Sequence, residues 1–160
     1  MNIIQTVEEY LSKHEIAYIL HTHPPVFTCE EAEIHCKTVP GIPGKNLFLR
    51  DKKGQRFFLV ILPAHKKADL KKIGTIVNDK KISFGNAEKL KTKLDLYPGA
   101  VSPFGLLNDK NTEVEVYIDR EMYEAELVNF HPNDNSASLE LTKEMFHKFL
   151  STLPHKIQII

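Results

Sequence analysis

The sequence predicts an α+β fold in a single domain, with a mixed, largely antiparallel β-sheet. Helical and strand-like segments alternate along the chain, and no linker, internal repeat or low-complexity tract separates them. Residues 57–62 are apolar on both faces of a strand, which is typical of a central, buried strand. The length of 160 residues suits one domain with its own core. We therefore expect residues 1–160 to fold as one unit.

The first third of the chain is expected to place a strand between two helices. Apolar residues at helical spacing predict an amphipathic helix over 3–14. A β-prone run then predicts a strand over 16–20, which the prolines that follow it end. Thr28 lies three residues before Glu31, the spacing of a capping box, so a short helix is expected over 29–36.

The middle of the chain is expected to begin with a β-hairpin. Residues 46–50 and 55–62 form its arms, because the polar, glycine-containing segment 51–54 between them has the chemistry of a turn. Further predicted elements are a helix at 69–73, a short extended piece at 82–84, and a helix that Asn86 caps and that ends near Leu94.

The last third is expected to be mostly β-structure. Segments 113–118, 124–129 and 137–141 are predicted to form an antiparallel meander, with a turn at 131–135 between the last two strands. Thr142 is expected to cap a final helix. The apolar face of that helix carries Met145, Phe146, Phe149 and Leu150.

Composition is ordinary for a globular protein, with 42% hydrophobic and 26% charged residues. No apolar run approaches the length of a membrane span, and the N-terminal residues lack the basic and apolar blocks of a signal peptide. The two cysteines do not make a disulfide framework. A cytoplasmic protein with no membrane partner is therefore expected.

Charge is unevenly distributed although the net charge is zero. Residues 66–93 contain nine lysines and three acids, whereas residues 113–144 contain nine acids and two basic residues. A basic segment in a neutral protein can face phosphates, and it can equally be a solvated helix face. Both interpretations stay open. The segment has neither a helix-turn-helix pattern nor aromatic residues interleaved with the basic ones, so sequence-specific binding of duplex DNA is not expected.

The stretch 41–49 combines two glycines and a proline before an apolar run. Glycine allows unusual backbone angles and lets another chain or a ligand come close. The resulting turn delivers Lys45 and Asn46 to the root of a strand, where a cation can be held in place. The alternative is an ordinary loop with a solvated lysine.

Three irregular loops could form one site. They are segments 41–46, 99–105 and 129–135, and each lies where a strand begins or ends. Together they offer the Lys45 cation, the Asn46 amide, the Ser102 hydroxyl, the His131 imidazole and backbone N–H groups. This set suits a carbonyl or ester whose oxygen becomes negative during hydrolysis. It contains no convincing nucleophile, so a water molecule or a substrate hydroxyl has to attack.

A metal site is a weaker hypothesis. The candidate ligands are His21, His23, Cys29, His35 and Cys36, but their spacing matches no usual zinc pattern. Cys36 as a nucleophile is less favoured still, because buried cysteine is usually inert. We expect no metal and no cofactor.

Three motifs in this order resemble the YbaK/ProX family, the free-standing relatives of the editing insertion domain of bacterial prolyl-tRNA synthetase. The motifs are residues 44–51, 99–105 and 129–133, and the resemblance covers nearly the whole chain. The run after Lys45 and the turn around His131 look most like the ProX branch, the alanyl-tRNA(Pro) deacylases. The resemblance also implies the family's fold, a barrel-like sheet flanked by helices.

The resemblance implies a trans-editing hydrolase that cleaves the aminoacyl ester of mischarged alanyl-tRNA(Pro). Lys45 matches the lysine most associated with activity in the family. The implied partners are the acceptor end of tRNA(Pro) and, as a further candidate, prolyl-tRNA synthetase. Two alternatives remain, a cysteinyl-tRNA(Pro) deacylase of the YbaK branch and a non-catalytic tRNA-binding relative that modulates translation.

Site residues follow in three groups from these arguments. The expected catalytic residues are Lys45, Asn46, Gly99, Ser102 and His131. The expected substrate pocket is Val26, Phe27, Thr28, Ala100, Val101, Pro103, Phe104 and Gly105. The expected tRNA-binding residues are Lys66, Lys67, Lys71 and Lys72.

Some of these residues have a second interpretation. We expect His131 to shape the pocket or to hold the α-amino group, and a turn histidine that caps its own loop is equally consistent with its position. Val26, Phe27 and Phe104 are expected to form the wall that excludes proline, although ordinary core positions would carry the same residue types.

Overall fold

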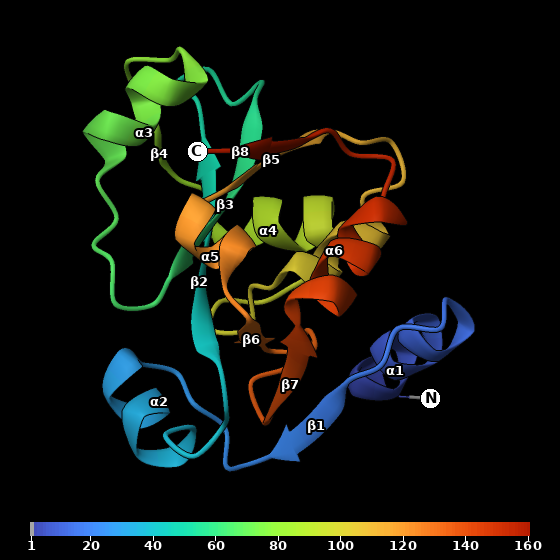
Figure 1. Ribbon diagram of the computed structural model, residues 1–160. Coiled ribbons are helices and arrows are strands. Elements are labelled where there is room, and N and C mark those ends of the chain that lie inside the picture. The colour runs from blue at the N-terminus through green and yellow to red at the C-terminus, as the bar shows by residue number, and fades with distance from the viewer. Residues whose placement is uncertain (1) are drawn as a thin grey trace.

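The computed structural model of the protein describes residues 2–160, except for the side chain of Cys29. Figure 1 shows a twisted sheet with helices packed around it. In chain order the elements are α1 (Ile3–Lys13), β1 (Ile19–Thr22), α2 (Cys29–His35), β2 (Ile42–Arg50), β3 (Phe57–Pro63), α3 (Leu70–Val77), β4 (Ser83–Phe84), α4 (Ala87–Leu94), the 3₁₀ helix η1 (Pro103–Asn108), β5 (Val114–Ile118), α5 (Arg120–Glu124), β6 (Leu127–Phe130), β7 (Ala137–Thr142), α6 (Lys143–Ser151) and β8 (Ile157–Ile159).

The eight strands form one mixed sheet in the order β1-β7-β6-β2-β3-β5-β8, with β4 paired to β2. Strands β1 and β8 are the two ends of this open path. The pairs β1–β7, β6–β7, β2–β3 and β2–β4 are antiparallel, whereas β2–β6, β3–β5 and β5–β8 are parallel. The predicted mixed sheet flanked by helices is confirmed.

Strand β2 joins the two halves of the sheet. Its first residues, Ile42 and Pro43, pair in parallel with Val128 and Asn129 of β6. From Gly44 onward the same strand pairs in antiparallel register with β3. The strand therefore changes partner immediately before Lys45, so the geometry of the candidate lysine depends on both halves of the sheet.

Two hydrophobic clusters cover the faces of the sheet. The larger one joins the apolar faces of α1, α4, η1, α5 and α6 to the strands. The smaller one places Ile73 and Val77 of α3 against Leu47 and Leu49 of β2. Strand β3 is buried along its whole length, as the apolar run 57–62 predicted.

The predicted meander of the last third is wrong in its first strand. Strand β5 pairs in parallel with β3 and β8 and does not pair with β6. The short helix α5 separates β5 from β6, and Asp119 caps it. Neither α5 nor β8 was expected, because the first is a single turn and the second is three residues long.

Strand β1 begins later than expected because Ile16 belongs to the end of α1. The Ile16 N–H donates to the Leu11 carbonyl (2.8 Å), and the Glu15 N–H donates to the Ser12 carbonyl (3.1 Å). Glu15 has a φ of 58°, so this is a Schellman closure with a left-handed residue after the helix. Ile16 is buried as its hydrophobic contact.

The two glycines of the 41–49 stretch serve contacts within the protein. A Cβ on Gly41 would lie 2.9 Å from the Leu127 backbone of β6, and Gly41 has a φ of 97°. A Cβ on Gly44 would lie 2.3 Å from the Phe130 ring. Of the two possibilities stated for these glycines, the close approach of another part of the chain is the one that the structure shows.

Replacing Gly44 by Ala is expected to destabilise the fold by about 1–3 kcal/mol, because the buried Phe130 ring has no room to withdraw. Urea denaturation followed by circular dichroism measures the change. In a Phe130→Leu background the same substitution should cost less, since the opposing ring is gone. An equal cost in both backgrounds would mean that the requirement for glycine at position 44 has a cause other than this contact.

Candidate functional site

Three segments far apart in sequence meet at Asn135. The Val26 N–H donates to the Asn135 carbonyl (3.2 Å), and the Asn135 side-chain amide donates to the Val26 carbonyl (2.8 Å). The Tyr97 hydroxyl donates to the Asn135 side-chain oxygen (3.1 Å). We call residues 26–28, 97–99 and 131–135 the Asn135 junction. It brings together the expected pocket segment and two of the three expected loops.

Gly99 borders an exposed aromatic ring in this junction. Its φ is 95°, which favours glycine, and a Cβ there would lie 3.6 Å from Cδ1 of Phe27. Phe27 is 66% exposed, whereas its neighbour Val26 is buried. Thr28 accepts from the Glu31 N–H (3.1 Å) and so caps α2. Gly99, Phe27 and Thr28 are all exposed, and Val26 alone is buried.

Ser102 is a structural cap. Its hydroxyl is fully buried, donates to the Asn133 side-chain oxygen (2.7 Å) and accepts from the Phe104 N–H (3.1 Å). Phe104 is also fully buried and packs edge-on against Phe130 and Phe149. Ser102, expected as a catalytic residue, and Phe104, expected as a pocket wall, therefore both attach the loop to the core.

The rest of the 99–105 loop is mostly scaffold. Ala100, Pro103 and Gly105 are buried, and a Cβ on Gly105 would lie 2.5 Å from Leu96. These three expected pocket residues fix the loop on the core. Val101 is half-buried and packs against the larger cluster.

His131 is a half-buried residue of the junction. Its Nδ1 lies 2.9 Å from the Ala137 carbonyl, a contact in which the ring N–H must be the donor, so Nε2 of the neutral ring is left as an acceptor. Burial lowers the pKa of His131 below the ordinary value of 6.5. The ring is therefore neutral at pH 7 and suited to accept a hydrogen bond.

The His23 ring lies next to the His131 ring. Sequence reasoning missed this position because it considered His23 only as a metal ligand. The two ring centroids are 6.1 Å apart. Nε2 of His23 lies 2.9 Å from the Ser138 hydroxyl oxygen and 3.3 Å from the Cys36 sulfur. Burial raises the pKa of the Cys36 thiol, which disfavours a nucleophilic thiolate.

No cluster of candidate metal ligands supports the metal hypothesis in the described part of the chain. Within residues 2–160, no three His, Cys, Asp or Glu side chains gather in a way that could hold a metal ion. The side chain of Cys29, one of the candidate ligands, lies outside the described residues.

Lys45 and Asn46 project from opposite faces of β2, because successive side chains of a strand alternate. Lys45 shares its face with Leu47 and Leu49 of the smaller cluster, and Asn46 shares its face with Phe48 of the larger one. Nζ of Lys45 donates to the Lys66 carbonyl (2.6 Å).

Asn46 contributes a buried oxygen, Oδ1, that has no hydrogen-bond partner. Among residues 2–160, no hydrogen bond links either Lys45 or Asn46 to the Asn135 junction. The expected catalytic residues therefore have separate anchors: Lys45 is hydrogen-bonded to the Lys66 carbonyl, and His131 to the Ala137 carbonyl.

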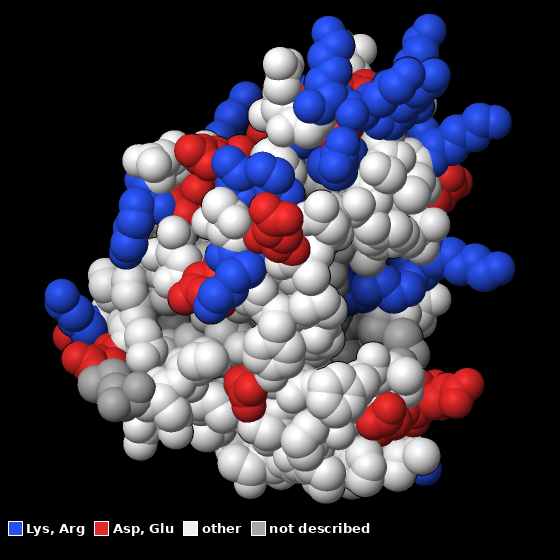
Figure 2. Space-filling view, turned by 180° about the vertical axis from the view of Figure 1, so that it is seen from behind, with Lys and Arg blue, Asp and Glu red and all other residues white. Residues whose placement is uncertain are grey.

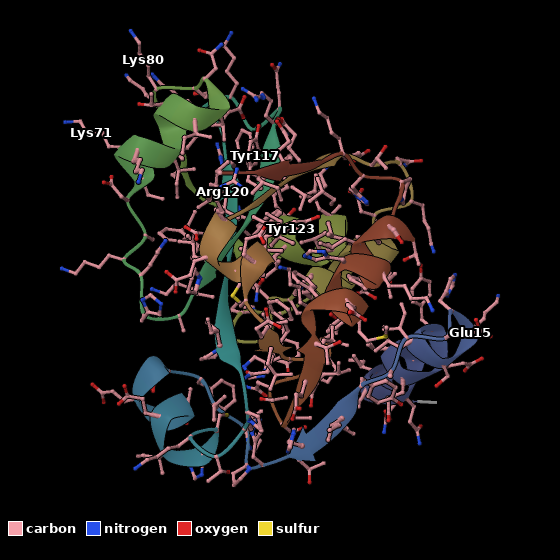
Figure 3. All side chains as sticks on the ribbon, in the orientation of Figure 1. Glu15, Lys71, Lys80, Tyr117, Arg120 and Tyr123 are labelled. Atoms are coloured by element: carbon pink, nitrogen blue, oxygen red, sulfur yellow. The ribbon has the colours of Figure 1, made fainter. Side chains whose placement is uncertain are left out.

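The expected tRNA-binding lysines also differ among themselves. Lys66 is paired with Asp119, at 3.0 Å from each carboxylate oxygen. Lys67, Lys71 and Lys72 are exposed. Figure 3 shows Lys71 pointing away from the molecule, and Figure 2 shows Lys and Arg gathered at the end of the molecule that carries α3.

Comparison with known families gives a match over residues 23–149 to the model described as the aminoacyl-tRNA editing domain. The chain belongs to the aminoacyl-tRNA editing domain family. The resemblance to the YbaK/ProX family is thereby confirmed, and the editing-domain protein described here is an aminoacyl-tRNA deacylase. Its helices within residues 2–160 include none that is long and apolar enough to cross a bilayer.

Two relatives are similar to this editing-domain protein over almost all of their length. The prolyl-tRNA editing protein ProX of Acetoanaerobium sticklandii is 42% identical over 151 residues, which cover 94% of this chain and 92% of the relative. The prolyl-tRNA synthetase associated domain-containing protein 1 of Xenopus laevis is 31% identical, with 98% and 95% covered.

Solved structures confirm the fold of the editing domain. A crystal structure described as a candidate trans-editing enzyme for prolyl tRNA synthetase has a TM-score of 0.73 at 19% identity, covering 99% of this chain and 96% of that one. A scaffold used for computational epitope grafting has a TM-score of 0.75 at 18% identity, covering 100% and 96%.

His131 is expected to make folding stability sensitive to acid. Because its pKa is lowered in the folded state, the unfolded chain binds a proton more readily as pH falls below about 6.5. Stability is therefore complete above that value and declines as pH falls toward the folded pKa. Urea unfolding at about pH 7.5 and about pH 5.5 should show a smaller loss for His131→Gln than for the wild type.

The control for this measurement is His35→Gln, since His35 is exposed at the end of α2. The control should keep the wild-type loss of stability. If His131→Gln and the wild type lose the same stability between the two pH values, the desolvation of His131 does not govern the acid response.

Proposed function

We propose that this deacylase hydrolyses the ester of alanyl-tRNA(Pro) in trans, releasing alanine and uncharged tRNA(Pro). The observation that carries the proposal is the 42% identity to a ProX protein over 94% of the chain. The Asn135 junction supports it, because the exposed Phe27 ring, the exposed Gly99 and the half-buried His131 all belong to this junction.

The chemistry of discrimination favours a small substrate. A synthetase pocket built for proline cannot strongly reject the smaller alanine, so a second site that admits alanine and excludes proline corrects the error. We assign this exclusion to Phe27 and Gly99, with Val26 behind them. A larger side chain at Gly99 would meet the Phe27 ring.

Lys45 is the group that we assign to the ester. Its ammonium donates to a neutral backbone carbonyl, so its charge is not neutralised by a carboxylate there, and further N–H donors remain for a developing oxyanion. Further donors are assigned to the backbone N–H groups of Gly99 and Val101, because those of Ala100, Phe104 and Gly105 already donate to Tyr97 and Ser102. A water molecule attacks the carbonyl carbon and expels the ribose oxygen. The vicinal hydroxyl of the terminal ribose is the group that can act on this water.

His131 and Asn46 are assigned to holding the substrate. Neutral His131 offers an Nε2 acceptor, which suits the α-ammonium group of the amino acid. The buried Oδ1 of Asn46 has no hydrogen-bond partner within the chain and is assigned as a second acceptor. Lys45 and Asn46 lie on opposite faces of β2. The terminal nucleotide therefore has to bind at the end of this strand, where it can contact both faces.

The deacylation assay compares alanyl-, cysteinyl- and prolyl-tRNA(Pro). Alanyl-tRNA(Pro) should be cleaved fastest and prolyl-tRNA(Pro) should be spared. Lys45→Ala should lower the single-turnover rate by about 10²–10³-fold, because it removes one preorganised donor to the oxyanion. Faster cleavage of cysteinyl-tRNA(Pro) would favour the YbaK-branch alternative.

Two outcomes would count against these assignments. Absence of turnover of all three substrates would favour a non-catalytic tRNA-binding relative. Turnover that survives Lys45→Ala would leave the enzyme intact and remove Lys45 from its site. Lys110→Ala is the control for loss of one positive charge, because Lys110 is exposed and lies outside every assigned group.

The basic surface around α3 is the part that we assign to the tRNA backbone. Lys67, Lys71 and Lys72 are exposed there, and phosphate binding by such lysines releases counterions. Docking on prolyl-tRNA synthetase and a cytoplasmic location remain predictions of the same proposal.

Lys71→Ala and Lys72→Ala should each weaken tRNA binding and reduce the slope of log K against log salt by about 0.7–0.9. Filter binding over a salt series measures both quantities. Lys13→Ala is the control, because Lys13 ends α1 at the opposite side of the view from α3 in Figure 1. An unchanged slope in the α3 variants would make this surface a solvated helix face.

A further inference from the structure

The Lys45 ammonium is oriented by the backbone of a distant loop. Its partner is the Lys66 carbonyl at 2.6 Å, in the segment between β3 and α3. A carbonyl orients an ammonium only if the carbonyl itself is held in place. The segment is anchored at its start, where the Ala64 N–H donates to the Pro43 carbonyl (2.8 Å), and the Lys66 N–H donates to the Pro63 carbonyl (3.0 Å) in a local turn. The constraint that remains to be supplied is one that ties residue 66 to an element outside this turn.

That constraint is supplied by the side chain of Lys66 itself. Its Nζ lies 3.0 Å from both carboxylate oxygens of Asp119 and 3.6 Å from Glu121. The Asp119 side chain is 15% exposed and that of Lys66 is 41% exposed, so the pair is partly shielded from water. The hydrogen bond to Asp119 raises the pKa of Lys66. The neighbouring His65 also contacts Glu121, which adds a second link between the loop and α5.

Asp119 is rigidly placed because three elements converge on it. Its N–H donates to the Ile61 carbonyl of β3 (2.9 Å), and its carboxylate accepts from the Glu121 N–H (2.8 Å) at the start of α5. The next residue, Arg120, donates its N–H to the Ile160 carbonyl (2.8 Å) beyond β8. Figure 3 shows Arg120 on α5, beside the strands. The carboxylate is therefore a fixed point for the Lys66 side chain.

We propose that the Lys66–Asp119 ion pair is a positioning device that aims the Lys66 carbonyl at Lys45 and so fixes the ammonium for the reaction. The ion pair acts through the backbone of residue 66, and neither side chain touches the substrate. This inference rests on the role of Lys45 in the proposed function. Lys66 is thereby given a role in setting the catalytic rate, whereas the sequence analysis had placed it among the tRNA-binding residues.

Single-turnover deacylation at saturating enzyme separates the two roles of Lys66. Lys66→Ala and Asp119→Asn should each lower the maximal rate roughly ten- to a hundredfold, because a small misplacement of a catalytic group is costly. The salt slope of tRNA binding should stay at the wild-type value. Lys66→Arg keeps the ion pair and should restore most of the rate.

The matched control is Lys143→Ala. Lys143 pairs with Glu124 of the same helix α5 at the same 3.0 Å, and its loss removes one positive charge without touching the Lys66 segment. Its maximal rate should equal that of the wild type. An unchanged rate in Lys66→Ala, or a reduced salt slope with a normal maximal rate, would overturn the positioning role in favour of phosphate contact.

A readout independent of activity is the NMR signal of the Lys45 side chain in protein with ¹³C,¹⁵N-labelled lysine, assigned with Lys45→Arg. The Lys45 Cε–Nζ signal should shift and sharpen in Lys66→Ala and Asp119→Asn, and it should keep its wild-type position in Lys66→Arg and Lys143→Ala. The same Lys45 signal in all variants would contradict the inference. If the wild type fails to deacylate any tRNA, the proposed function fails, and this measurement still decides whether the ion pair positions Lys45.

Discussion

The close packing of β2 on β6 is the constraint on which the rest of the structure depends. Gly41 and Gly44 let β2 approach the Leu127 backbone and the Phe130 ring, and only then can one strand pair in parallel with β6 and in antiparallel register with β3. Lys45 follows directly after this change of partner. A side chain at either glycine would separate the halves of the sheet, so the position of the lysine is a consequence of core packing.

Buried polar groups hold the loops that border the candidate site. Asn133 accepts from Ser102, and Asn135 joins Val26 to Tyr97, so each amide spans two segments. Polar groups inside a protein need partners, and such networks fix one arrangement of the surrounding chain. The junction therefore fixes one arrangement of the three segments, with Phe27 and Gly99 exposed at its surface.

Charge in this protein has two separate uses that a count of lysines cannot distinguish. Lys66 is committed to Asp119, whereas Lys71 points into solvent from α3. The acidic segment around α5 supplies the partner for the first. Only the lysines without such a partner remain for the backbone of a nucleic acid.

The sequence by itself determined the elements with strong local signals and the family. The buried run of β3, the capped helices and the three motifs are local patterns, and the structure and the comparisons confirm them. Tertiary structure alone decided that β5 runs parallel to β3, that Lys45 and Asn46 face opposite ways, and that Ser102 and Lys66 serve other residues. These depend on contacts between residues far apart in the chain, and no local pattern of residues encodes which distant partner satisfies a hydroxyl, a carbonyl or a charge.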